Sequence, residues 1–178
     1  MKFFVLLLAA VWTLEVSAHA RLLPGGTTPP RSNNPGLKTG PCGGIAKNMN
    51  PTVEFQAGQT IVVQWEETID HPGYYELSIS SDNDETFQIL LEVPDTQNGR
   101  DTLPHRWQAN LTLPAGLTCS SCTLRLIQWM TENPANPRPY FSCADIRIVE
   151  RDEPVPMPPI DEERNQLNPP PPVEDCHD

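Results

Sequence analysis

Basic side chains are scarce in this sequence of 178 residues, and so are long apolar runs and helical periodicity. It has 12 Lys and Arg against 23 Asp and Glu, which gives a formal net charge of −11. A chain this acidic offers no basic patch to replace the counterions around phosphate, so nucleic-acid binding is excluded. Nor does it offer a polybasic segment for an anionic membrane surface. No apolar run is as long as a membrane-spanning helix, which takes about 20 residues. We therefore expect neither a nucleic acid nor a membrane as a partner.

The first 18 residues have the pattern of a secretory signal peptide. Lys2 supplies the positive charge, residues 3–12 are apolar, and the small side chains of residues 16–18 precede a cleavage site. Cleavage after Ala18 would make His19 the first residue, whereas a competing cleavage after Ala20 would leave Arg21 first. We therefore expect a secreted protein, or a periplasmic one in a bacterium, and both cleavage sites stay open.

Composition divides the remaining chain into a body, residues 19–149, and a tail, residues 150–178. The tail has nine acidic residues, two Arg and eight Pro. It cannot bury enough apolar surface to offset the entropy of ordering, so we predict an acidic, proline-rich disordered tail. The domain organisation is then a signal peptide, one β-domain and this tail.

Apolar and polar side chains alternate through the body with the two-residue period of β-strands. We predict at least six strands, at residues 60–65, 74–80, 87–93, 106–113, 123–130 and 140–149. Turn residues separate them, and their spacing is typical of a two-sheet β-sandwich. Residues 21–50 are rich in Gly, Pro and Asn and are predicted to form a long N-terminal loop. Trp65, Trp107 and Trp129 lie within strand patterns, so we predict that they belong to the core rather than to an exposed aromatic strip.

Export favours disulfide bonds between the cysteines. Four of them, Cys42, Cys119, Cys122 and Cys143, lie in the body and allow three pairings. We favour Cys42–Cys143 as a long staple and Cys119–Cys122 as a local clip at a turn. A redox role for the Cys119–Cys122 pair is the weaker alternative, because no βαβ pattern surrounds it. Cys176 in the tail is left over and is either free or intermolecular.

Of the four histidines, His19 is unusual because processing would give it a free α-amine. That amine and the ring Nδ1 form a chelating pair, and an imidazole opposite them would complete a set of three nitrogens. Nitrogen ligands in a tetragonal arrangement favour Cu(II). His71 is the natural second imidazole, since it lies in a turn stiffened by Pro72 and Gly73 just before a strand. His105, at a strand start, is interpreted as structural, and His177 lies in the tail.

Several motifs occur in the order known from lytic polysaccharide monooxygenases and related secreted proteins, which the sequence resembles. They are His19-Ala-Arg-Leu, Gly40-Pro41-Cys42-Gly43-Gly44, Glu67-Thr68-x-x-His71-Pro72-Gly73-Tyr74-Tyr75, Cys119-x-x-Cys122-x-Leu124-x-x-Ile127-Gln128-Trp129 and Tyr140-Phe141-x-Cys143-Ala144-Asp145-Ile146. The resemblance implies an immunoglobulin-like or fibronectin-like sandwich with one copper ion in a histidine brace. In that brace His19 gives its amine and Nδ1, His71 gives a ring nitrogen, and Tyr140 is the axial aromatic residue.

The resemblance also implies a function, which is the copper-dependent oxidative cleavage of glycosidic bonds in a chitin-like or cellulose-like polysaccharide. An external electron donor would be the second partner, and we expect a monomer. Arg138 departs from the pattern, because many of these enzymes have Gln or Glu two residues before the axial aromatic. Arg stays protonated, so Arg138 either holds an oxygen species as a fixed cation or pairs with a surface carboxylate.

Two functions of other classes compete with this enzyme. The first is a secreted copper-binding or copper-delivery protein with the same brace and no polysaccharide turnover. The second is a carbohydrate-binding protein that has lost its metal, which the intact pair of His19 and His71 disfavours. Asn110-Leu111-Thr112 is in addition an N-glycosylation sequon, predicted to lie on the outward face of its strand.

Overall fold

A computed structural model describes residues 19–99 and 102–151, and these residues form eight β-strands and no α-helix. The predicted signal peptide and almost all of the predicted tail lie outside the described residues, as do Cys176 and His177. Within the described ranges no helix could cross a membrane. The strands are β1 (Ala20–Leu22), β2 (Glu54–Gln56), β3 (Thr60–Glu67), β4 (Gly73–Ser80), β5 (Gln88–Pro94), β6 (His105–Thr112), β7 (Cys119–Met130) and β8 (Arg138–Val149).

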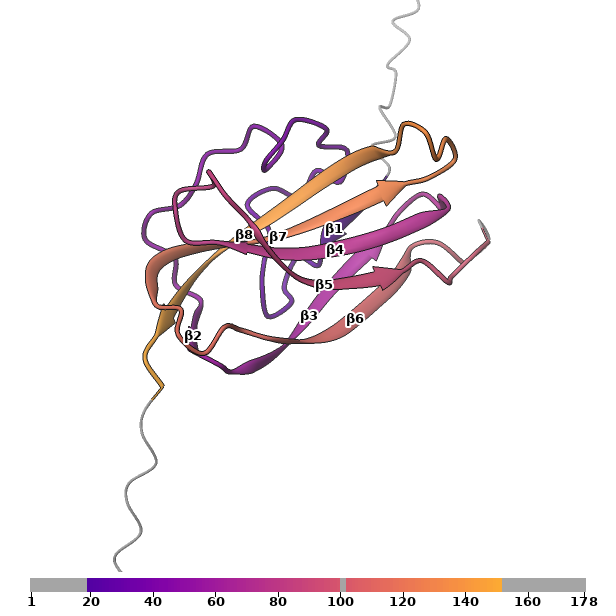
Figure 1. Cartoon of the computed structure of the whole chain (residues 1–178). Helices are drawn as coiled ribbons and strands as arrows, with labels where there is room; N and C mark the ends of the chain where they lie inside the picture. The colour runs from indigo at the N-terminus through magenta and orange to yellow at the C-terminus, as the bar shows by residue number, and fades with distance from the viewer. Residues whose placement is uncertain (1–18, 100–101, 152–178) are drawn as a thin grey trace, which may run out of the picture.

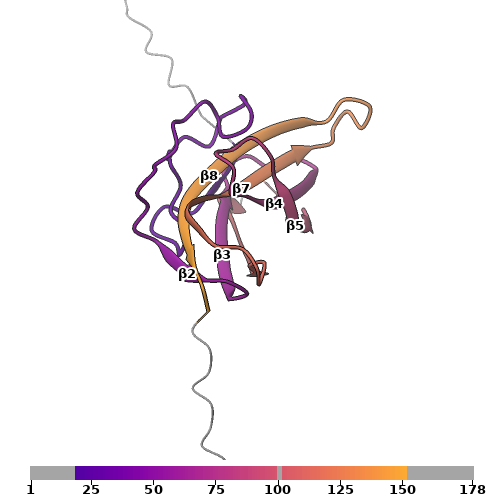
Figure 2. The ribbon, with the colours of Figure 1, turned by 60° about the vertical axis from the view of Figure 1, so that its left-hand side comes forward.

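The strands form two sheets, which confirms the predicted all-β sandwich (Figure 1). One sheet has the order β1-β3-β6, and the other has the order β2-β8-β7-β4-β5. The pairs are antiparallel except for β2 with β8, which is parallel. Figure 2 shows the larger sheet curving over β3 and the loop between β7 and β8 projecting from the sandwich.

Alternating side chains of both sheets fill the core, as the sequence predicts. Val63, Trp65, Tyr75 and Leu77 are fully buried between the sheets. Trp107 is half-buried and packs against this core. Trp129 does not, and its predicted place in the core is wrong.

Trp129 is half-buried and outside the core cluster. On β7 the core side chains are Leu124 and Leu126, and side chains alternate between the two faces of a strand. Trp129 therefore lies on the outer face, where its ring stacks with Tyr74 at a centroid separation of 6.3 Å. Its indole N–H donates to Glu76 over 3.4 Å. Alternation identifies the faces of a strand, but an aromatic side chain can pack on the outer face too.

Two short strands, β1 and β2, were not predicted, and Arg21 and Leu22 lie in β1 rather than in the long loop. Three residues carry too little pattern to predict a strand, and both strands exist only through pairing with β3 and β8. The rest of the predicted loop is confirmed and runs beside β8 (Figures 1 and 2). Backbone bonds tie it there, from Arg31 N to the Cys143 carbonyl over 2.7 Å and from Phe141 N to the Leu37 carbonyl over 2.9 Å.

Both favoured disulfides are present. Cys42–Cys143 joins the long loop to β8, with its Cα atoms 5.5 Å apart. Cys119–Cys122 lies at a register shift within the first residues of β7, not at a turn before the strand as predicted. The first bond links segments 101 residues apart in sequence, and it fixes the loop to the strand that carries Tyr140.

Candidate metal centre

His19 is held beside the end of β3 by the pairing of β1. Ala20 lies opposite Glu67 in the ladder, so the residue before Ala20 meets Thr68. The Thr68 amide donates to the His19 carbonyl over 3.2 Å, and the Thr68 hydroxyl lies 3.1 Å from both the nitrogen and the oxygen of the His19 backbone. This contact places His19 next to the segment that carries His71.

His71 lies in the connection between β3 and β4, as predicted. The Pro72 carbonyl accepts hydrogen bonds from the amide and the hydroxyl of Thr131, over 2.8 Å and 3.1 Å. At Gly73 a Cβ atom would lie 1.9 Å from the Trp129 carbonyl oxygen. Only glycine allows this approach, so the sequence Pro72-Gly73 fixes the His71 loop against the end of β7.

The structure brings three predicted site residues together. The rings of His19 and His71 are parallel within 5°, with centroids 5.0 Å apart. Tyr140, from β8, also stacks on the His19 ring, with the two ring centroids 3.2 Å apart. Tyr140 is buried, with 4% of its surface exposed. The ammonium of Lys38, from the long loop, lies 5.2 Å from the centre of the Tyr140 ring. The side chains that meet at this point come from four separate segments of the chain.

The environment of His19 suits a metal ligand. Its Nδ1 is buried and has no hydrogen-bond partner among the residues that the structure describes. Burial, together with the charges of His71 and Lys38, lowers the pKa of the His19 ring to about 3. A metal binds the neutral imidazole, so this ring needs no deprotonation at neutral pH. A buried nitrogen without a partner, next to a second imidazole, fits a metal ion that binds nitrogen.

Glu132 is a residue of the site that sequence analysis missed. It lies in the projecting loop between β7 and β8, and its carboxylate contacts Nδ1 of His71. A metal-binding His usually donates its other ring N–H to such a group, which fixes the ring and its tautomer. The contact therefore leaves Nε2 of His71 as the nitrogen for a metal. No local pattern marks Glu132, because the fold of the loop alone brings it to His71.

Residues 17–161 match the family model described as "Copper acquisition factor BIM1-like". The chain belongs to this BIM1-like family. No curated protein matches the sequence. Among solved structures, the chain is similar to a lytic polysaccharide monooxygenase AA15 from Thermobia domestica in the Cu(I) state, at 19% identity. The match covers 73% of this chain and 98% of that one, with a TM-score of 0.55.

More distant solved structures include a cellulose-active polysaccharide monooxygenase from M. thermophila, at 16% identity. It covers 78% of this chain and 67% of that one, with a TM-score of 0.45. Entomopoxvirus fusolin matches at 15% identity, over 76% of this chain and 47% of that one, with a TM-score of 0.45. The AA15 likeness supports the monooxygenase-like sandwich fold. The family associates the chain with copper, and the two disulfides agree with an extracellular or cell-surface protein.

Arg138 begins β8 and is exposed. It lies two residues before Tyr140, and residues two apart on a strand share a face. Among the described residues its guanidinium has no hydrogen bond or ion pair, so the predicted pairing with a surface carboxylate is not present there. Arg138 is therefore exposed on the strand face that also carries Tyr140.

His105 has structural hydrogen-bond partners, as the sequence suggests. It is 2% exposed; its Nδ1 lies 3.0 Å from Glu67 Oε2, and its Nε2 lies 3.0 Å from the Gly99 carbonyl oxygen. Burial would lower the pKa of His105, but these hydrogen bonds and the nearby charges raise it. Glu67, Asp70 and His105 place three potential ligand atoms within 4.8 Å of one another. Because each already has a protein partner, with Asp70 accepting from the Gly99 amide over 2.9 Å, the group is a hydrogen-bonded cluster.

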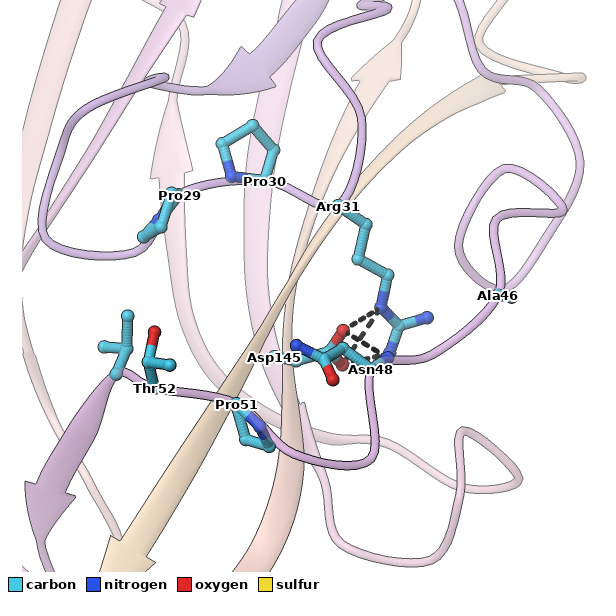
Figure 3. A pocket seen from close by; sticks show the side chains of 9 residues that line it. Pro29, Pro30, Arg31, Ala46, Asn48, Pro51, Thr52 and Asp145 are labelled. Carbon is cyan, nitrogen blue, oxygen red and sulfur yellow. Dashed lines mark hydrogen bonds and ion pairs between the residues drawn. The ribbon is translucent and has the colours of Figure 1, made fainter.

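A separate pocket of about 300 Å³ lies under the long loop and contains none of the predicted site residues (Figure 3). Its charged groups are Arg31 and Asp145, joined by bonds of 2.6 to 3.0 Å. Arg31 also donates to Asp84 over 2.8 Å and to Thr123 over 2.7 Å. The N–H groups of the Arg31 guanidinium donate to these protein acceptors. We therefore assign Arg31 a structural role, which is to fix the long loop against β8.

Asn110 is exposed on β6, as expected for the glycosylation sequon. The neighbouring Leu111 is buried, which confirms the predicted alternation. An attached glycan would extend away from the core.

Proposed function

We propose that, after removal of residues 1–18, this chain binds one copper ion outside the cell and holds it for acquisition by a partner. The α-amine and Nδ1 of His19 and Nε2 of His71 would bind the metal, and Tyr140 would lie next to them, stacked on the His19 ring. The observation that carries this proposal is the buried, unpartnered Nδ1 of His19 beside a parallel second imidazole.

The chemistry of these donors supports copper over other common metals. Imidazole and amine nitrogens in a tetragonal set favour Cu(II), which also leads the affinity order of the divalent first-row ions. The net charge of −11 attracts cations to the molecule as a whole. The BIM1-like family, described by copper acquisition, supports delivery of the metal rather than its use in catalysis.

Cleavage after Ala18 is part of this proposal, because a chain beginning at Arg21 has no His19. For the test, the full chain is expressed with its own leader, residues 1–18. The intact mass of the secreted product then identifies its first residue. Titration calorimetry and the electron paramagnetic resonance (EPR) spectrum of Cu(II) then give the stoichiometry and the nitrogen ligands. One tightly bound Cu(II) with three nitrogens is expected, and a first residue of Arg21 or the absence of tight Cu(II) binding would overturn the proposal.

Oxidative cleavage of a polysaccharide is the second candidate function, and the stacking of Tyr140 against His19 is the observation in its favour. Bound copper would supply one-electron redox chemistry, and an exposed Arg138 could hold an anionic oxygen species at the rim. The copper-loaded protein is incubated with a reductant and with chitin, cellulose and other insoluble glycans. Oxidised oligosaccharides would favour the enzyme, whereas tight Cu(II) binding without such products favours copper acquisition.

Arg138 provides a further comparison if products form. Arg138→Ala should retain copper affinity and lower the yield, since loss of one preorganised donor costs about 10²–10³ in rate in a hydrolase example. Arg138→Gln should retain more activity than Arg138→Ala. Equal yields from all three proteins at matched copper loading would exclude a role for Arg138 in turnover.

A further inference from the structure

Three buried polar side chains form one hydrogen-bonded chain behind the candidate metal centre. Gln128 is 2% exposed, Glu67 is fully buried, and His105 is 2% exposed. Gln128 lies on β7, directly opposite Tyr140 in the β7–β8 ladder. Burying polar groups of this kind costs folding free energy unless every one of them is paired. The partners of these three side chains therefore show which parts of the protein they hold in place.

Gln128 contacts the backbone next to His19. Its Oε1 accepts a hydrogen bond from the Ala20 amide over 2.8 Å, and its Nε2 donates to Glu67 Oε1 over 2.7 Å. The carboxylate can only accept when ionised and the backbone amide can only donate, so the two partners fix which way the Gln128 amide faces. Neither Glu nor Leu at position 128 could satisfy both partners.

Glu67 in turn contacts the backbone of His71. Its Oε1 also accepts from the His71 amide over 3.3 Å, and its Oε2 is held by His105. One continuous path therefore leads from the peptide after His19, through Gln128 and Glu67, to the peptide of His71. The two ligand-bearing segments are thus joined by two side chains, Gln128 and Glu67.

We propose that Gln128 is a positioning residue, which sets the separation and orientation of His19 and His71 through its contact with the Ala20 amide and, by way of Glu67, with the His71 amide. The inference rests on the proposed copper binding by those two residues. Groups outside the ligand set typically change metal affinity by about 10–100-fold when lost. We expect a loss of this size in Gln128→Leu, which leaves the Ala20 amide and the Glu67 carboxylate without their partner.

Ser142→Ala is a matched control. The Ser142 hydroxyl accepts from the Leu22 amide over 3.1 Å and is buried, so its loss also removes an acceptor for an amide of β1. Ser142 has no contact with Glu67 or His71 among the described interactions. Both variants should lower the unfolding temperature of the copper-free protein, but only Gln128→Leu should change the Cu(II) site.

The experiment measures Cu(II) affinity by competition and records EPR spectra at matched copper loading for wild type and both variants. A shifted spectrum with about 10–100-fold weaker binding in Gln128→Leu alone supports the positioning role. An unchanged spectrum and affinity in Gln128→Leu, or the same change in Ser142→Ala, would overturn it. Wild type that binds no Cu(II) would instead refute the proposed function.

Gln128→Asn keeps the test decisive if Gln128→Leu does not fold. Its amide is one methylene shorter and cannot reach both Ala20 and Glu67, so the same spectral change is expected. An unchanged spectrum and affinity in a folded Gln128→Asn would overturn the positioning role.

Discussion

Two buried polar clusters flank β8, and they differ in what their side chains still lack. Arg31 donates to Asp84, Asp145 and Thr123, and its side chain is 4% exposed. At the candidate metal centre His19 is half-buried, and its buried Nδ1 has no partner among the described residues. A satisfied cluster stabilises the fold, whereas an unsatisfied nitrogen costs free energy that a ligand can recover. A buried nitrogen without a partner that also lies against a second imidazole therefore distinguishes the candidate binding site from the structural Arg31 cluster.

The strongest way to break this contrast is to remove the unsatisfied group. His19→Ala, or an unprocessed N-terminus, should lower Cu(II) affinity by more than the about 100-fold that loss of a supporting group can cost. Calorimetry on secreted protein measures this loss. His71→Ala should act in the same direction without unfolding the sandwich, because His71 lies in a loop. Wild-type affinity in either variant would show that the ligands are wrongly assigned.

Arg31→Ala should have the opposite profile, with a large effect on stability and none on copper. It leaves the Asp145 carboxylate without its cation and Asp84 with only the longer 3.7 Å pair to Lys47, and breaking a buried pair costs about 3–5 kcal/mol. Urea unfolding of the copper-free protein measures the change. Arg147→Ala is the control, because its pair with Glu54 spans 3.7 Å and both side chains are largely exposed. A similar loss of stability in the two variants would contradict the structural role of the Arg31 cluster.

A smaller effect is expected at Glu132, which orients His71. Glu132→Gln should weaken Cu(II) binding about 10-fold and leave the unfolding temperature unchanged, because the side chain is 46% exposed. Competition against a chelator of known affinity measures the change. Glu85→Gln, at another exposed loop position, serves as the charge-matched control and should bind Cu(II) as wild type does.

Acid should reveal the buried state of His19 in the copper-free protein. The ring titrates near its ordinary pKa of about 6.5 when unfolded and at about 3 when folded. Between these values the unfolded chain holds one more proton, so His19 makes the free energy of unfolding fall as pH decreases from 6.5 to 3. Subtracting the pH profile of His19→Ala isolates this contribution. A difference that does not vary below pH 6.5 would show that the ring titrates normally in the folded protein.

The smallest effect is expected at Lys38, whose ammonium lies over the Tyr140 ring. Lys38→Met removes a cation–π contact worth about 0.5–1 kcal/mol and a positive charge near the metal. Cu(II) affinity should rise slightly, and its dependence on salt should decrease. Lys47→Met, at a cation paired with Asp84 instead, should leave Cu(II) affinity unchanged.

The sequence predicts the parts of the molecule that depend on local pattern. Alternation identifies six of the eight strands. The histidine positions identify His19 and His71, and the resemblance to the monooxygenases adds Tyr140; the structure brings these three residues together. Glu132, Gln128 and Arg31 are different, because the partners described above lie 53 to 114 residues away from them in sequence. Such partners depend on strand register and loop path, and a single sequence does not encode them in a readable pattern.

The direction of β8 has a consequence for how the molecule is presented to its surroundings. Tyr140 lies near the start of this strand beside His19, and Val149 ends it roughly 30 Å away at about 3.3 Å per residue. In Figure 1 the two ends of the described chain leave the sandwich at opposite sides. Anything joined to the chain after Arg151 is therefore attached at the end of the sandwich opposite the candidate metal centre. If the domain were attached to another molecule at that end, His19 and His71 would lie on the side that faces away from the attachment.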